Sequence, residues 1–427
     1  MNPSNPLPAF HRLKRTGPAM AALPQLAQTV REALAALKME REKLQGKNIA
    51  LTVGSRGIAN LSLLVRTVGE WLKASGARPF IVPSMGSHGG ATPEGQRKVL
   101  ADYGITEEEL GIPVRSQMDA VHLGSTPEGF DVFMDRLAFE SDGVVVFNRI
   151  KTHTDFSGRI ESGWLKMLAI GLGKVQGART CHRYCRQYGY EKSIRAMGSW
   201  SLASGKILCG VGVIENEEHE ICAVRAARPD QLIKTEEEAL ILARKLLPRL
   251  PFRNIDLLIV DQLGKNISGT GFDTKVIGRG VPLEPNEAPE IKLIYLRDIT
   301  PESEGNALGI GMADFMHERC FRKVDLKKTY INTQAALNPP MGFLPMHFPS
   351  DGEAVRFAVN VLGDRDKSHN RIAWIKNTLL LSEILASDAL LTDGPSSGAY
   401  VGAQPPITPS FDAEDNLVSG WEAEQAP

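Results

Sequence analysis

The chain has 427 residues, of which 42% are hydrophobic and 23% charged, and its formal net charge is −1. This composition is globular rather than disordered, and the balanced charge excludes the basic excess that is typical of nucleic-acid-binding domains. No apolar run reaches the roughly 20 residues that span a bilayer, so we expect no membrane partner. A chain of this length exceeds one ordinary core, which predicts two domains.

The first half of the chain alternates between helical periodicity and short apolar runs. The expected elements are helices over Leu26–Lys47 and Leu61–Ser75 and from Glu94, and strands over Asn48–Val53, Pro79–Pro83, Asp142–Phe147 and Ile207–Ile214. Alternating strands, loops and helices are typical of a parallel α/β sheet.

The second half repeats this pattern after a proline-punctuated segment. A helix over Asp230–Leu247 ends at Pro248 and Pro251, which marks the expected domain boundary. The later expected elements are strands over Ile255–Asp261, Ile291–Leu296 and Ala389–Thr392, and helices over Ser303–Met316 and Ile372–Ala386. We therefore predict an α/β protein with two α/β domains and mainly parallel sheets. Residues 1–250 would carry the cofactor and catalytic loops, and residues 251–427 would form the second domain, with the last segment packing back on the first.

The cysteines and the N-terminus indicate the compartment. The odd, sparse set of cysteines lacks the spacing of a disulfide framework; it comprises Cys181, Cys185, Cys209, Cys222 and Cys320. The opening MNPSNPLPAF lacks the apolar core of a signal peptide. We expect reduced thiols and a cytoplasmic protein.

Three polar, glycine-rich loops follow expected strands, where open α/β sheets bind their ligands. In the first, Gly54-Ser55-Arg56-Gly57, Arg56 offers a planar fork for a carboxylate or phosphate, or is the exposed arginine of a tight turn. In the second, SMGSHGGAT, the imidazole of His88 suits proton transfer at neutral pH. This loop also leads into a helix with Thr92 as N-cap and Pro93 at the first position, and both interpretations are compatible.

The third loop and the helix after it, from Asn148 to His182, are rich in titratable side chains. Lys166 lies among Trp164, Leu165 and Met167. Apolar surroundings lower the pKa of a lysine and make it a nucleophile or covalent anchor; the alternative is a surface lysine whose stem packs on apolar neighbours. His182 has no second Cys or His pair nearby to complete a structural zinc site, which leaves open a role as a single ligand to a cofactor-held metal.

Three motifs together resemble the lactate-racemase-like superfamily, the nickel-dependent racemases and epimerases of 2-hydroxy acids. The motifs are RIKTHTDFSGRIESGWLKMLAIGLGK followed by Cys181-His182, PSMGSHGGATPEGQ, and KNISGTGFDTKVIGR. The resemblance covers roughly Ile49 to Arg279. Lys166 and His182 are 16 positions apart, which is similar to the family's spacing between the anchoring lysine and the nickel-ligating histidine.

The resemblance implies a cofactor and a set of site residues. The cofactor would be a nickel-pincer nucleotide, a pyridinium bis-thio-carboxylate mononucleotide that holds nickel. Lys166 would bind it covalently and His182 would ligate the nickel. Ser55, Gly171 and Gly173 would also contact the cofactor. The catalytic bases would be His88 and His153, one on each face of the substrate, and Arg56 would hold a substrate carboxylate or a cofactor phosphate.

The implied reaction fits these residue types. Removing the α-proton of a 2-hydroxy acid creates a carbanion beside a carboxylate, whereas removing a hydride leaves a stable 2-keto acid. Two histidines of near-neutral pKa supply the proton steps, each worth roughly 10²–10⁴-fold in rate. The expected partners are a small 2-hydroxy acid and the enzymes that synthesise the cofactor.

The chain departs from the family pattern at three places. The interval from His153 to Lys166 is longer than in lactate racemases proper, and the arginine loop reads Gly-Ser-Arg-Gly in place of Asp-x-Thr-Arg-Pro. The segment Gly269–Lys275 stands where the family has Tyr-Gln-x-x-Lys. Asp273 and Lys275, with Lys265 and Arg279 nearby, would therefore bind a larger and more polar acid than lactate. The alternative is a glycine-rich turn that closes the sheet.

Two other classes of function remain open from the sequence. One is a zinc- or iron-dependent hydrolase or lyase that uses His88, His153 and His182 as direct metal ligands. The other is a non-enzymatic binding module for an anionic metabolite, in which the glycine-rich loops bind the anion. If the chain is instead a racemase or epimerase, we expect its active site in the cleft between the two domains.

Overall fold

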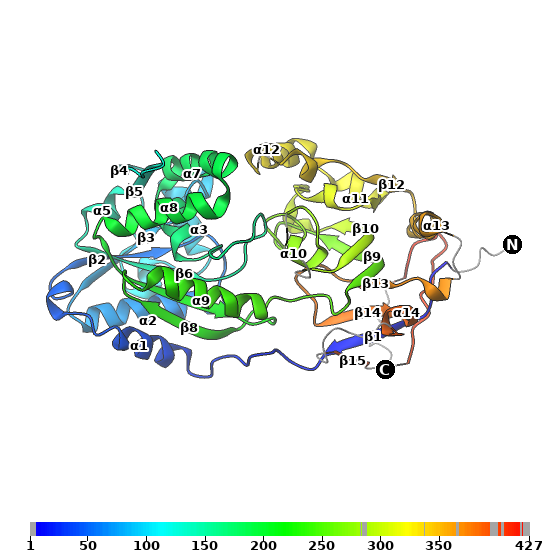
Figure 1. Cartoon of the computed structure of the whole chain (residues 1–427), viewed down its shortest axis with the longest axis horizontal. Helices are drawn as coiled ribbons and strands as arrows, with labels where there is room; N and C mark the ends of the chain where they lie inside the picture. Colours follow the sequence, from blue (N-terminus) through cyan, green and yellow to red (C-terminus); the bar gives the residue numbers. More distant parts are fainter. Residues whose placement is uncertain are drawn as a thin grey trace. The chain divides into compact units, whose positions relative to one another are not determined.

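Two units make up the computed structural model, each built on its own sheet (Figure 1). The structure describes residues 6–281, 283, 288–336, 338–363, 367–392, 400–402, 405–418 and 421. Pro18–Leu247 form one unit, called here the N-terminal unit. Met1–Gly17 and Pro248–Pro427 form the other, the C-terminal unit.

The N-terminal unit contains a five-stranded sheet of order β3-β2-β6-β7-β8. Its first four strands run parallel and the last is antiparallel. The strands are β2 (Asn48–Val53), β3 (Arg78–Pro83), β6 (Gly143–Arg149), β7 (Ile207–Glu215) and β8 (Ile221–Ala227). On one face pack α1 (Leu26–Ala36) and α2 (Leu61–Ala74), which lie together in Figure 1. On the other face pack α6 (Trp164–Lys166), α8 (Tyr190–Ala203) and α9 (Leu232–Lys245).

Strand β2 shows why the sequence forms this layered sheet. Ile49, Leu51 and Val53 belong to the core cluster under α1 and α2, whereas Ala50 belongs to the cluster under α8 and α9. A strand that is buried on both faces needs apolar side chains at every position, and this requirement produces the continuous apolar run in the sequence. Because β2, β3 and β6 run parallel, their carboxyl ends lie at one edge of the sheet.

Further elements surround that edge. They are η2 (Gly89–Ala91), α3 (Pro93–Ala101), α4 (Glu107–Leu110), β4 (Ala120–Ser125), β5 (Asp131–Asp135), α5 (Arg136–Glu140), the π-helical turn η3 (Met167–Gly171) and α7 (Lys174–Tyr188). The turn η3 separates α6, which carries Lys166, from α7, which carries His182. Short π-helical segments occur frequently at functional sites.

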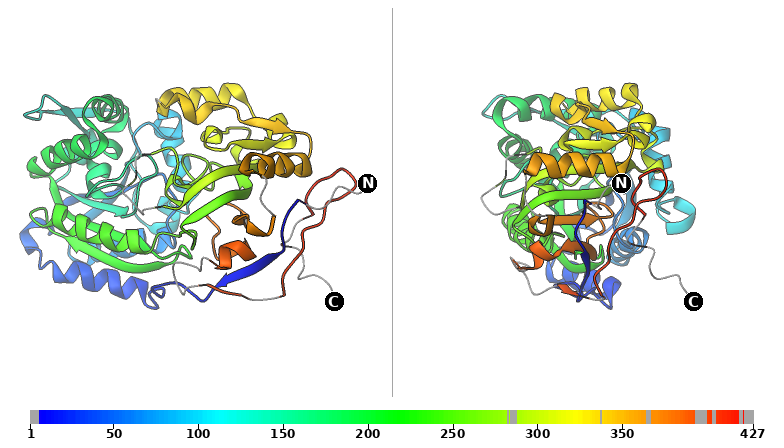
Figure 2. Two further views of the ribbon diagram at one scale, coloured as in Figure 1. Left: turned by 45° about the vertical axis from the view of Figure 1, so that its right-hand side comes forward. Right: turned by 90° about the vertical axis from the view of Figure 1, so that its right-hand side faces the viewer.

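The C-terminal unit contains an eight-stranded mixed sheet of order β12-β11-β10-β9-β13-β14-β1-β15. Its strands are β1 (Phe10–Arg15), β9 (Asn254–Leu263), β10 (Glu290–Ile299), β11 (Phe315–His317), β12 (Met346–Phe348), β13 (Ile372–Ile375), β14 (Glu383–Ser387) and β15 (Tyr400–Gly402). Its α-helices are α10 (Thr274–Ile277), α11 (Glu318–Lys323), α12 (Leu326–Ala336), α13 (Asp351–Leu362) and α14 (Asp388–Thr392). The dark blue β1 and the red C-terminal trace lie side by side in Figure 2, since β1 pairs with both β14 and β15.

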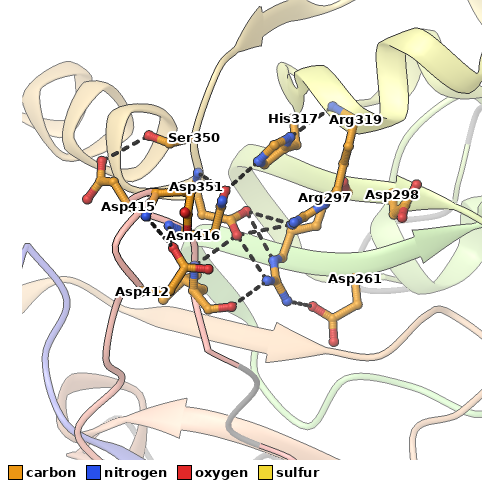
Figure 3. Close-up of polar contacts among 12 residues, drawn as sticks. Asp261, Arg297, Asp298, His317, Arg319, Ser350, Asp351, Asp412, Asp415 and Asn416 are labelled. Atoms are coloured by element: carbon orange, nitrogen blue, oxygen red, sulfur yellow. Dashed lines mark hydrogen bonds and ion pairs between the residues drawn. The ribbon is translucent and has the colours of Figure 1, made fainter.

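A buried polar network fastens the C-terminal segment to this unit (Figure 3). The fully buried Asp351 accepts two hydrogen bonds from Arg297, at 3.1 and 2.9 Å, and two from Arg319, at 3.2 and 3.0 Å. It also accepts the backbone N–H of Leu417 at 2.9 Å. Arg297 in turn contacts Asp261 at 2.7 Å. Because both carboxylate oxygens of Asp351 are paired within the protein, we interpret the network as structural.

The predicted fold class is confirmed: the protein is α/β, with two mainly parallel mixed sheets. The break between the units follows Leu247, close to the boundary expected after residue 250. Residues 10–15, expected in the first domain, instead form β1 of the C-terminal sheet. Strand β15 of the last segment pairs with β1 within the C-terminal unit, and packing of the last segment on the first domain stays a prediction. The location of the active site in an interdomain cleft stays a prediction.

The remaining corrections concern single elements. The expected helix Leu26–Lys47 ends at Ala36. The stretch Ser303–Met316 forms turns, the short 3₁₀ helix η5 (Ile310–Met312) and part of β11 rather than one α-helix, because Gly305 and Gly309 adopt φ values of +80° and +95° that break helical geometry. Across the described ranges, no helix combines the length and apolar character that crossing a membrane requires.

The expected helix Ile372–Ala386 and strand Ala389–Thr392 are also wrong. The first is the pair of strands β13 and β14, and the second lies within α14. Asn377 explains the break, because its side-chain oxygen accepts the backbone N–H groups of Leu379 and Leu380, both at 2.9 Å. Such a side-chain cap turns the chain back and allows a second strand to follow.

Candidate functional site

The loops after the adjacent strands β2 and β3 meet at the carboxyl edge of the N-terminal sheet. The Ser55 hydroxyl of the first loop contacts Nδ1 of His88 on the second. The His88 ring is exposed, and so is the side chain of Arg56. Thr92 caps α3 by accepting the Gly95 N–H at 3.0 Å, which confirms the predicted N-cap. His88 therefore stands on a loop that is tied at both ends and is open to a ligand.

The loop after β6 holds His153 in a defined orientation. The backbone N–H of Asp155 donates to Nδ1 of His153 at 3.0 Å, so the neutral ring carries its proton on Nε2. The Asp155 carboxylate lies 3.7 Å from the same nitrogen. The buried Glu161 accepts the His153 N–H at 2.5 Å and an N–H of Arg244 at 2.6 Å. The buried carboxylate thus fixes the backbone on which the histidine stands.

Lys166 ends α6 in a partly buried position. Burial, the largest cause, and the charge of the nearby Arg56 lower its pKa to about 8, although Asp155 opposes the shift. The pKa direction agrees with the apolar surroundings inferred from the sequence. The neutral, nucleophilic amine is therefore a minority species near pH 7, but it is far more populated than in an ordinary lysine. Arg56, Asp155 and Lys166 consequently share one electrostatic environment.

His182 lies on α7; part of its side chain is exposed, while its ring is surrounded by enough protein atoms to sense Lys166. Removal from water lowers the pKa of its imidazole, and the charge of Lys166 lowers it further. A neutral imidazole is the form that ligates a metal ion. Behind it, the buried thiols of Cys181 and Cys185 are 3.7 Å apart. All five cysteines are free of disulfides.

Gly171 and Gly173 serve close packing in the structure. A Cβ at Gly171 would lie 2.5 Å from the carbonyl oxygen of Ser84, and one at Gly173 would lie 2.8 Å from Cα of Gly177. The Gly171 carbonyl also accepts the N–H of Gly86 at 3.1 Å. These contacts seat η3 against the His88 loop. Contact of either glycine with a cofactor stays a prediction.

The candidate residues of the C-terminal unit have structural partners of their own. The Asp273 carboxylate caps α10 by accepting the Lys275 N–H at 2.9 Å. Lys275 is buried. Arg279 pairs with Asp314 at 2.7 Å and donates to three backbone carbonyls, so it shapes its loop rather than offering an open guanidinium. Lys265 donates to the carbonyl of Gly269.

The structure adds a site residue that the sequence analysis missed, Glu236 of α9. Its buried carboxylate accepts the Leu165 N–H at 2.9 Å and so caps the short helix that carries Lys166. Burial raises its pKa to about 7. A signal existed in the sequence, because Glu236 occupies an apolar-face position of α9, at helical spacing between the buried Leu232 and Leu240.

Five of the predicted site residues thus come together in one unit, at the carboxyl edge of one sheet. They are Ser55, Arg56, His88, Lys166 and His182. His153 joins them through Asp155. In the part of the chain that the structure describes, no group of three or more His, Cys, Asp or Glu side chains is arranged to hold a metal ion.

Comparison with known proteins gives a solved structure of similar fold and a family model that matches part of the chain. The lactate racemase apoprotein from Thermoanaerobacterium thermosaccharolyticum matches with a TM-score of 0.55 and 14% identity, over 87% of this chain and 99% of that one. The two chains therefore share a fold. Residues 17–190 match the family model of the lactate racemase N-terminal domain. The resemblance inferred from the motifs is confirmed. Comparison with curated proteins gives no match.

Proposed function

We propose that the protein is a racemase or epimerase of a 2-hydroxy acid that uses a nickel-pincer nucleotide. The observation that carries the proposal is the environment of Lys166. A lysine of lowered pKa stands with Arg56 and His182, inside the segment that matches the lactate racemase N-terminal domain. The protein is then an isomerase, and the enzymes that make the cofactor are its partners.

The residues present fit this cofactor. A neutral amine at Lys166 suits a covalent link to an acyl group, and the low pKa of Lys166 makes that form available. His182 offers a neutral nitrogen donor of the kind that nickel accepts. Ser55, Gly171 and Gly173 border the same edge of the sheet. When bound, the cofactor supplies the hydride acceptor, which no side chain can provide.

The two histidines handle the hydroxyl proton. Nδ1 of His88 contacts the Ser55 hydroxyl, a group that accepts a hydrogen bond as readily as it donates one. The ring can therefore present Nε2 as a proton acceptor. His153 in its observed state presents Nε2–H, because Nδ1 accepts from Asp155. We assign His88 to proton removal and His153 to hydrogen bonding of the oxygen in this state, with Asp155 supporting a positive charge on the ring.

Arg56 orients the acid. Its guanidinium is exposed next to the lysine whose pKa it lowers, and it can bind a carboxylate with two parallel hydrogen bonds. Its charge also contributes to lowering the pKa of Lys166. Asp273 and Lys275 of the C-terminal unit remain candidate contacts to a more polar substrate than lactate.

An activity screen tests the proposal. The full chain is produced with and without the cofactor-synthesis enzymes and assayed by chiral chromatography on lactate, malate, longer aliphatic hydroxy acids and sugar acids. We expect inversion at C2 of at least one acid, only with coexpression and nickel. A zinc-containing preparation that hydrolyses or eliminates its substrate, or tight acid binding that survives His88→Ala without any turnover, would favour the alternative classes.

A further inference from the structure

A fully buried lysine stands at the first position of α7. Lys174 adopts a left-handed φ of +54°, which only a few per cent of non-glycine residues do. Its ammonium forms an ion pair with the fully buried Asp135 at 2.9 Å. It also donates to the carbonyl of Pro83 at 2.6 Å and to the side-chain oxygen of Gln96 at 3.0 Å. The ammonium thus donates two hydrogen bonds and pairs with one carboxylate.

Two of these acceptors lead to the loop that carries His88. Pro83 is the last residue of β3, directly before that loop. Gln96, fully buried on α3, turns its amide toward the loop and donates to the carbonyls of Gly86 at 2.9 Å and His88 at 3.3 Å. A chain of polar contacts therefore runs from the start of α7 to the backbone of His88 itself.

Stability alone does not explain this arrangement. Burying an ion pair generally stabilises a protein no more than apolar side chains of similar size would, so its presence calls for another reason. The partners of Lys174 also join elements that otherwise carry separate parts of the site. They connect β3 and the His88 loop with α7, the helix of His182.

We propose that Lys174, Asp135 and Gln96, called here the Lys174 cluster, hold the His88 loop at a fixed place against α7 and so position His88 for proton transfer. They are positioning residues, since none of them is assigned to substrate or cofactor. The catalytic consequence rests on the proposed function, whereas the restraint on the loop does not.

The first test measures the loop without any cofactor. The amides of Gly86, His88 and Ala91 donate within the loop or to Gly171, so their hydrogen exchange reports its order. In full-length Gln96→Leu we expect exchange in the peptide covering residues 84–92 to quicken by about tenfold or more. Gln28→Leu is the control, since Gln28 is an exposed glutamine of α1 whose amide contacts Glu32. It should leave that exchange unchanged.

The second test uses the loaded enzyme. A displacement of about 1 Å costs up to about 10²-fold in rate, so Gln96→Leu should lower kcat by about 10- to 100-fold with little change in KM. In a His88→Ala background the same substitution should cost nothing further. An equal loss in both backgrounds would show a general structural effect and overturn the proposal.

A variant of the same shape covers the case in which Gln96→Leu does not fold. Gln96→Glu keeps an oxygen for Lys174 but removes the amide that donates to Gly86 and His88, so it should also quicken exchange. Unchanged hydrogen exchange of the His88 loop in a folded Gln96 variant would refute the proposed role of the Lys174 cluster. If exchange quickens but the wild-type chain racemises no acid, the cluster stands and the proposed function fails.

Discussion

The carboxylate of Glu236 makes the stability of the N-terminal unit depend on pH. Its side chain is buried against the start of α6, where burial raises its pKa from 4.5 to about 7. A carboxyl group whose pKa is higher in the folded than in the unfolded chain stabilises the fold when protonated. This contribution is fully present below pH 4.5 and is lost as the pH rises through 7.

The size of the effect follows from the shift. Between pH 5 and pH 8 the linkage relation gives a loss of about 2.5 kcal/mol in the free energy of unfolding for this group. Glu236→Gln removes the titration. The difference between wild type and Glu236→Gln should therefore change by about 2.5 kcal/mol, in favour of the variant as the pH rises.

Urea denaturation of both chains at pH 5 and pH 8 measures this difference. Glu238→Gln is the control, because it removes an exposed carboxylate from the same helix and should retain the wild-type pH dependence. An identical difference between wild type and Glu236→Gln at the two pH values would show that Glu236 is not buried against α6. The inference that Glu236 caps α6, the helix that carries Lys166, would then be wrong.

Three further predictions concern single side chains. His88→Ala should lower kcat by about 10²–10⁴-fold while nickel content is retained, and simultaneous loss of nickel would assign His88 to the cofactor instead. Arg56→Lys keeps the charge but cannot form two parallel hydrogen bonds to a carboxylate, so KM for the acid should rise. An unchanged KM would show that Arg56 does not bind the substrate. Asp351→Asn leaves Arg297 and Arg319 without their buried partner and should destabilise the chain by about 3–5 kcal/mol in urea, whereas a loss below about 1 kcal/mol would contradict the network.

The sequence predicted the parallel strands well, for a physical reason. Strands such as β2 and β6 are buried on both faces, so their apolar runs are visible without knowledge of the partner strands. The pair β13 and β14 was mistaken for a helix, because short buried strands and a buried helix have similar apolar content. Strand β1 was invisible, since its partners lie more than 350 residues away in the chain.

The residues of the candidate site also differ in how well the local sequence predicts them. The sequence predicts Arg56, His88 and Lys166 as site residues because their own loops follow strands or because their immediate neighbours are apolar. Glu236 and the Lys174 cluster did not, since what gives them a role is contact with residues tens of positions away. Local sequence therefore indicates the residues that face a ligand more readily than the residues that hold them in place.

The covalent state of Lys166 tests the central claim most directly. The full chain, coexpressed with the cofactor-synthesis enzymes, is digested and its peptides are sequenced by mass spectrometry, with nickel measured on the same sample. We predict a nucleotide adduct on Lys166, absent without coexpression and absent in Lys166→Ala, but retained in the control Lys192→Ala, which removes an exposed lysine. An adduct on another lysine, or nickel-dependent racemisation with Lys166 unmodified, would contradict the account.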